Sequence, residues 1–177
     1  MPTQVSLTLL NTGFVFGFEA LVVRGQPWKW AKLPCLTALI HHPLAGWGLF
    51  DTGYSPRFFE ATHAFPYRIY RWLTPVEIQA NGSQLAQLQR YGLTAADIRW
   101  IFLSHLHGDH CCGVRDFPQA RIVVSQQSIS EVLPLAGLAA LQAAYLPELL
   151  DQRLRHIEAG QLGPLVVSGT QTSDFKL

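Results

Sequence analysis

The stretch SHLHGDH, residues 104–110, decides how this sequence is interpreted. Its last six residues include three histidines and one aspartate. Successive side chains of an extended segment point to opposite sides, so His105 and His107 can point the same way and bind one metal ion. Asp109 and His110 can then bind a second ion beside it. The pattern predicts a metal centre with His105, His107, Asp109 and His110 as ligands.

Two short apolar runs lead into the turns around this candidate site. Residues 100–103, Trp-Ile-Phe-Leu, predict a buried strand from Arg99 to Ser104, so the motif follows the C-terminal end of a strand. Residues 47–50, Trp-Gly-Leu-Phe, predict another strand, which ends in the turn residues Asp51-Thr52-Gly53. Asp51 is therefore expected at a loop tip, where it either caps the turn or orients a ligand histidine.

The buried strand, the motif and the following Gly113 closely resemble the HxHxDH signature of the metallo-β-lactamase superfamily. Phe50-Asp51-Thr52-Gly53 resembles the upstream aspartate turn of that family, and the resemblance covers roughly Val5 to Val124. It implies an α/β fold, an αββα four-layer sandwich with the site along one edge. It also implies that His105 and His107 bind a first zinc ion and that Asp109 and His110 bind a second. Iron or manganese would suit the same ligands.

Hydrolysis is the chemistry that this resemblance implies. A metal-activated water would attack the carbonyl of a small ester, lactone, thioester or amide. Asp109 is the candidate catalytic residue as well as a ligand. The arrangement resembles the lactonase and general-hydrolase branches of the family more than the antibiotic-destroying ones.

The C-terminal part of the sequence departs from the family pattern. Members normally add a third histidine, a bridging aspartate and a last histidine there. His156 is the only histidine after the motif and lacks a Gly-His turn context, and Asp174 lies in a polar tail. We therefore expect a domain that lacks much of its C-terminal half, with apolar sheet surface left uncovered. The alternative function is a catalytically silent, truncated relative that binds metal weakly or not at all.

Composition indicates one domain, residues 1–177, because 49% of the chain is hydrophobic and only 14% is charged. The formal net charge of +1 gives no long-range field for nucleic acid or an anionic membrane, so the predicted partner is a small-molecule substrate. Three cysteines form no disulfide framework, and no signal or membrane-spanning segment is evident, which predicts a cytoplasmic protein. The oligomeric state does not follow from the sequence.

Short apolar runs bounded by glycine or proline predict the remaining strands, at residues 5–9, 21–24, 35–42, 121–124, 153–158 and 165–167. Helical spacing predicts helices at residues 83–91, 125–133 and 138–146, the first two capped by Ser83 and Ser125. The aromatic-rich segment 55–75 is interpreted as an irregular insertion, whose rings either line an acyl pocket or pack in the core. Cys111 and Cys112 are interpreted as small buried residues that begin a helix.

Overall fold

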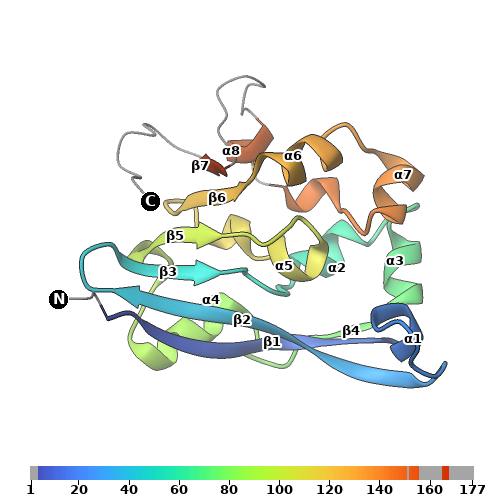
Figure 1. Ribbon diagram of the computed structural model, residues 1–177, viewed down its shortest axis with the longest axis horizontal. Helices are drawn as coiled ribbons and strands as arrows, with labels where there is room; N and C mark the ends of the chain where they lie inside the picture. The colour runs from blue at the N-terminus through green and yellow to red at the C-terminus, as the bar shows by residue number, and fades with distance from the viewer. Residues whose placement is uncertain (1–3, 151, 156–164, 168–177) are drawn as a thin grey trace.

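The computed structural model describes residues 4–150, 152–155 and 165–167. They form one mixed sheet of seven strands in the order β4-β1-β2-β3-β5-β6-β7. Figure 1 shows β1, β2, β3, β5 and β6 side by side, from the bottom of the view to the top. The strands are β1 Ser6–Phe18, β2 Trp30–His42, β3 Gly46–Phe50, β4 Val76–Glu77, β5 Ile98–Phe102, β6 Arg121–Ser125 and β7 Leu165–Val167.

Strand direction changes in the middle of the sheet. β1, β2 and β3 are antiparallel neighbours, as expected for an opening sheet built from consecutive strands. β5 then pairs in parallel with both β3 and β6, and β7 closes the edge antiparallel to β6. The parallel pairing brings the C-terminal ends of β3 and β5 to the same edge, so the loop that follows each strand begins at that edge.

Short helices connect the strands. They are α1 Glu19–Val22, α2 Arg57–Ala61, α3 Arg68–Leu73, α4 Gln84–Leu88, α5 Gly108–Cys111, α6 Gln126–Val132, α7 Gly137–Gln142 and α8 Gln152–Arg155. The predicted serine caps are present, because Ser83 Oγ accepts from the Ala86 amide and Ser125 Oγ accepts from the Ser128 amide.

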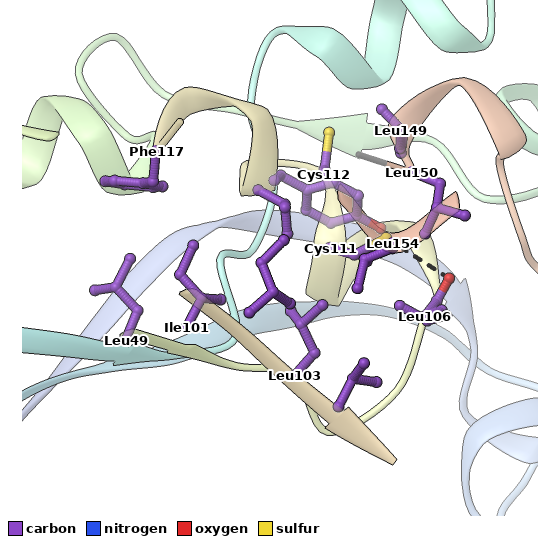
Figure 2. Packing of buried hydrophobic residues seen from close by; sticks show 14 of the residues in the cluster. Leu49, Ile101, Leu103, Leu106, Cys111, Cys112, Phe117, Leu149, Leu150 and Leu154 are labelled. Atoms are coloured by element: carbon purple, nitrogen blue, oxygen red, sulfur yellow. Dashed lines mark hydrogen bonds between the residues drawn. The ribbon is translucent and has the colours of Figure 1, made fainter. Parts of the chain in front are cut away.

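The hydrophobic core lies between one face of the sheet and these helices. Leu49 of β3, Ile101 of β5 and Ile122 of β6 are fully buried on that face. Figure 2 shows Leu49 and Ile101 in one cluster with residues that follow the strands, namely Leu103, Leu106, Cys111, Cys112, Phe117, Leu149, Leu150 and Leu154. The motif loop contributes Leu106 and Cys111 to this cluster, so the packing that stabilises the domain also fixes the loop.

Four sequence predictions differ from the structure. The predicted strand at 21–24 lies where β1 turns back into β2, and its first two residues belong to α1. The described part of 153–158 is helical in α8, while 156–158 lie outside the described residues. Segment 55–75 is not irregular but contains α2 and α3. The helix predicted at 138–146 ends at Gln142, before a left-handed turn at Ala144. Short apolar runs do not distinguish helix from strand, which explains the first two errors.

No helix within the described ranges is long and apolar enough to cross a membrane.

Candidate metal centre

The motif loop follows β5 directly. Leu103 and Leu106 are buried, whereas His105 is half-buried and His107 is exposed. Leu106 therefore anchors the loop in the core, while the two histidines on either side of it lie toward solvent. α5 begins immediately after His107 and carries the remaining motif residues, Asp109 and His110.

The histidine rings lie against one another. The ring centroids of His105 and His107 are 4.3 Å apart, and those of His105 and His110 are 4.0 Å apart. His110 Nε2 lies 3.2 Å from Asp109 Oδ2. The fold thus brings together all four side chains that the sequence predicts as metal ligands.

Asp51, which directly follows β3, contacts this cluster through His110 and Ser104. Its Oδ2 lies 2.8 Å from His110 Nδ1, and its Oδ1 accepts a hydrogen bond of 2.8 Å from the Ser104 amide. Asp51 is nearly fully buried and has a positive φ of 58°, a strained conformation that persists only when its surroundings fix it. Of the two sequence-based interpretations of Asp51, the contacts favour the one in which it orients a histidine.

Ser104 is a site residue to which sequence reasoning assigned no role. Its hydroxyl lies within hydrogen-bond distance of both Asp51 carboxylate oxygens, at 3.0 and 2.8 Å. The same oxygen lies 3.0 Å from His105 Nδ1 and 3.2 Å from His110 Nδ1. Its position directly before the first motif histidine was the available signal. Ser104 links the aspartate turn to two histidines at once.

Backbone hydrogen bonds join the aspartate turn to α5. The Thr52 amide donates to the His110 carbonyl at 2.8 Å, and the Thr52 hydroxyl accepts from the Gly113 amide at 3.0 Å. On the other side, the Cys35 thiol of β2 donates to the Asp109 carbonyl at 3.0 Å. These hydrogen bonds connect the two loops, so the backbone sets the spacing between Asp51 and His110.

His110 lies between two carboxylates, which decides its protonation. Burial, the largest single influence, lowers the pKa of His110, but hydrogen bonds and charges from Asp109 and Asp51 outweigh it and raise the pKa to about 9. Burial would raise the pKa of Asp109, but the hydrogen bond and charge of His110 hold it below its usual value. Near neutral pH, without metal, His110 is therefore protonated between the two carboxylates, and its Nε2 has to lose a proton before it can bind a metal ion.

The pKa values of His105 and His107 are lowered, unlike that of His110. Partial loss of solvation by the surrounding loop is the largest cause and lowers the pKa of both, and the nearby His110 lowers them further by charge repulsion. A neutral imidazole is the form that binds a metal ion. These two side chains are therefore kept in the ligand-competent state at neutral pH.

The donor set fits zinc chemically, because imidazole nitrogen and carboxylate oxygen are its usual ligands together with thiolate. His110 is fixed through Nδ1, which leaves Nε2 facing Asp109, so two donor atoms converge on one place. Within the described ranges, however, no three His, Cys, Asp or Glu side chains are arranged to share a single metal ion. The site is a cluster of donors rather than a formed coordination sphere. The ligand roles of the four motif residues stay predictions.

Other residues considered from the sequence lie apart from this cluster. Cys111 and Cys112 are buried, and burial raises the pKa of both thiols, which agrees with their interpretation as packing residues. They do not begin a helix, however, because α5 ends at Cys111 and Cys112 is its C-cap. Phe58 of the aromatic segment is fully buried in the core, but Phe65 and Trp72 are 75% and 66% exposed, so the core-packing interpretation holds for only part of that segment. The downstream candidates His156 and Asp174 lie outside the described residues.

Comparison with known proteins identifies the family. The family model described as the metallo-beta-lactamase superfamily matches residues 31–165. No curated protein matches the chain. Three similar solved structures are an N-acyl homoserine lactone hydrolase with N-hexanoyl-L-homoserine bound at its catalytic metal centre, a probable metal-dependent hydrolase from Staphylococcus aureus, and the dizinc quorum-quenching lactonase AidC.

These likenesses concern the fold. The TM-scores are 0.65, 0.59 and 0.54, at identities of 22%, 21% and 22%. The matches cover 83%, 77% and 77% of this chain but 58%, 52% and 47% of the solved ones, so the chain spans about half the length of the structures that it resembles. A mixed sheet with helices packed on one face agrees with part of such a fold, which confirms the predicted fold class. Because the family model matches most of its length, the chain belongs to the metallo-beta-lactamase superfamily.

Proposed function

We propose that this chain is a metal-dependent hydrolase of a small ester, lactone or thioester. The observation that carries the proposal is the cluster of His105, His107, Asp109 and His110 beside β5, held by Asp51, in a member of this superfamily. Several structures of similar fold are N-acyl homoserine lactone hydrolases, which makes a lactone the first substrate class to test.

In this proposal, some residues of the site bind metal and others orient the metal-binding side chains. His105 and His107 would bind one ion, Asp109 and His110 would bind a second, and Asp51 and Ser104 orient the rings. When bound, zinc supplies a Lewis acid and an acidified water, and iron or manganese suits the same donors. We propose a small molecule as the partner because the net charge of +1 favours neither nucleic acid nor membrane. The single domain and the cytoplasmic location stay predictions.

A second function has its own supporting observation. Among the residues that the structure describes, no three donors are arranged around one point. This favours a catalytically silent protein that binds metal weakly or not at all. The two functions differ in whether the chain retains metal and in whether retained metal produces turnover.

The test is metal analysis followed by assay. The purified chain would be loaded with zinc, dialysed, and analysed for metal content, and hydrolysis of an N-acyl homoserine lactone and an aryl ester would be measured. We expect about two ions per chain, as in two-metal hydrolase sites, and hydrolysis that a chelator removes. A folded chain that retains no metal would overturn the hydrolase proposal. Retained metal without turnover would favour the silent protein.

Asp51→Asn tests the positioning role of this buried carboxylate. The amide keeps one oxygen acceptor but places an NH2 group where Asp51 now accepts from Ser104 or His110. We expect zinc affinity to fall by about 10- to 100-fold, as for other residues that orient metal ligands. Competition with a fluorescent zinc chelator measures the change. Asp116→Asn is the matched control, because the ion pair of Asp116 with Arg57 involves no motif residue. Equal losses in both variants would contradict the positioning role.

A further inference from the structure

Two tyrosines carry hydroxyl groups that the fold itself does not use. Tyr54 directly follows the aspartate turn, where its amide donates to Thr12 Oγ1 at 3.1 Å, and Tyr70 lies in α3. Among the described residues, no group is hydrogen-bonded to either phenol oxygen. Tyr67, one helical turn before Tyr70, provides a contrast, because its hydroxyl accepts from the Gly137 amide at 3.1 Å. The hydroxyls of Tyr54 and Tyr70 are therefore available to another molecule.

Both oxygens can be reached from solvent, although the rings are largely covered. Tyr54 is only 1% exposed, and Tyr70 is half-buried. In the part of the chain that the structure describes, Gln84 Nε2 is the one side-chain nitrogen or oxygen atom that is fully buried and without a partner. The oxygens of Tyr54 and Tyr70 also lack a partner, so neither of them is fully buried. The small exposed fraction of Tyr54 therefore includes its hydroxyl.

One phenylalanine fixes both rings. Phe58 is fully buried, and its ring centroid lies 5.2 Å from that of Tyr54 and 5.7 Å from that of Tyr70. Both contacts are edge-to-face, at interplanar angles of 75° and 68°, which is a favoured geometry for aromatic pairs. The rings are thus held in place before a ligand binds, so binding does not have to order them.

The two hydroxyls lie near the same part of the candidate metal centre. Burial is the largest cause that raises the pKa of both phenols, and for Tyr54 the neighbouring Tyr70 is the next. The Asp109 carboxylate and the Cys35 and Cys112 thiols raise the pKa of both further. Because Coulomb interactions weaken with distance, action by the same three groups indicates that the hydroxyls lie close together beside α5. Both phenols stay protonated at neutral pH and can donate a hydrogen bond there.

We propose that Tyr54 and Tyr70 donate hydrogen bonds to an uncharged carbonyl oxygen of the substrate, beside Asp109. A carbonyl oxygen accepts from two phenols at once, because it has two lone pairs. An anionic group would be repelled by the Asp109 carboxylate and would lose its hydration next to the buried ring of Phe58. That the acceptor belongs to a substrate rests on the proposed hydrolase function, whereas binding of the acceptor requires no metal ion.

Tyrosine NMR with a matched pair of probes tests this inference. The full chain, with carbon-13 at Cζ of every tyrosine, would be titrated in the presence of chelator with N-cyclopentyl hexanamide and separately with hexanoate. The amide has an uncharged carbonyl and no ester, whereas hexanoate carries the same acyl chain as an anion. The titration would extend to about 10 mM, because a ligand of this size is expected to have a dissociation constant on the order of 1 mM. We expect the amide, but not hexanoate, to shift the Tyr54 and Tyr70 signals.

Tyr54→Phe and Tyr70→Phe assign the signals and measure what each hydroxyl contributes. Each variant is expected to weaken amide binding by about 2- to 10-fold, because one hydrogen bond to the probe is lost. Neither hydroxyl has a partner among the described residues, so both variants should fold as the wild type does. Tyr91→Phe is the matched control, since Tyr91 is 44% exposed in the 3-10 helix Gln89–Tyr91 and should leave amide binding unchanged.

The possible outcomes distinguish this inference from the hydrolase proposal. An amide that leaves both tyrosine signals unshifted, or hexanoate that binds equally well, would overturn the inference. Unchanged amide affinity in either Tyr54→Phe or Tyr70→Phe would overturn it as well. A chain that hydrolyses lactones but shows no amide shift would refute this inference alone. Amide shifts in a chain that retains no metal would support the hydrogen-bonding role and refute only the hydrolase proposal.

Discussion

Replacing His107 with alanine is expected to remove metal from the loaded chain and to lower lactone or ester hydrolysis by about 100-fold or more, the upper range seen even for residues that only support ligands. His107 is exposed and lies beside His105, so its removal takes a donor from the cluster without leaving a cavity in the core. The free energy of unfolding without metal should therefore stay within about 0.5 kcal/mol of wild type.

Elemental analysis, chelator competition and the hydrolysis assay measure this change together. His63→Ala is the matched control, because it also removes an exposed histidine but lies in the segment after α2. We expect His63→Ala to retain metal and activity. A His107→Ala chain with full metal content would show that the loop is not the metal centre, whatever the activity of the wild type.

Gly53→Ala is expected to lower the free energy of unfolding by about 3 kcal/mol or more, from overpacking and backbone strain together. A Cβ on Gly53 would overlap with the side chain of Thr12, and the residue has a φ of 63°. Thr12 is fully buried, donates to the Cys35 carbonyl and accepts from the Tyr54 amide, so it cannot move aside cheaply. Urea unfolding of the metal-free chain measures the loss.

Gly92→Ala separates the two causes. Gly92 has a similar φ of 69°, but an added Cβ would meet nothing within 4 Å. Backbone strain alone should cost this variant about 1 to 2 kcal/mol. If the free energy of unfolding fell by the same amount in both variants, the contact with Thr12 would not contribute to the loss in Gly53→Ala. A clearly larger loss for Gly53→Ala would assign the difference to packing beneath the aspartate turn.

Local patterns predicted much of the sheet and the helix caps. The run at 100–103 predicted β5 because its apolar residues are bounded by a polar motif, and the serine caps were predictable because capping depends on neighbours three residues away. The segment containing α1 was wrongly predicted as a strand, since the turn from β1 to β2 is set by long-range pairing that a short apolar run does not encode.

The sequence predicted the candidate metal donors of the site, but not the residues that hold those donors in place. The spacing of His105 and His107 is a local property, and the fold brings these rings together as the alternation predicts. The hydrogen bonds from Ser104 to Asp51 connect residues 53 positions apart, so only the parallel pairing of β3 with β5 reveals them. Cys35, which donates to the Asp109 carbonyl, carried no sequence signal for this role.

The separation between Asp51 and the motif also has a consequence for the order of folding. Asp51 and His110 are 59 positions apart, and the closure of such a loop has an entropic cost that later contacts must offset. Until β3 and β5 pair, the nascent chain carries its histidines on an unanchored loop with no defined geometry. If the loop binds metal as proposed, we therefore expect metal capture to follow assembly of the sheet instead of nucleating it.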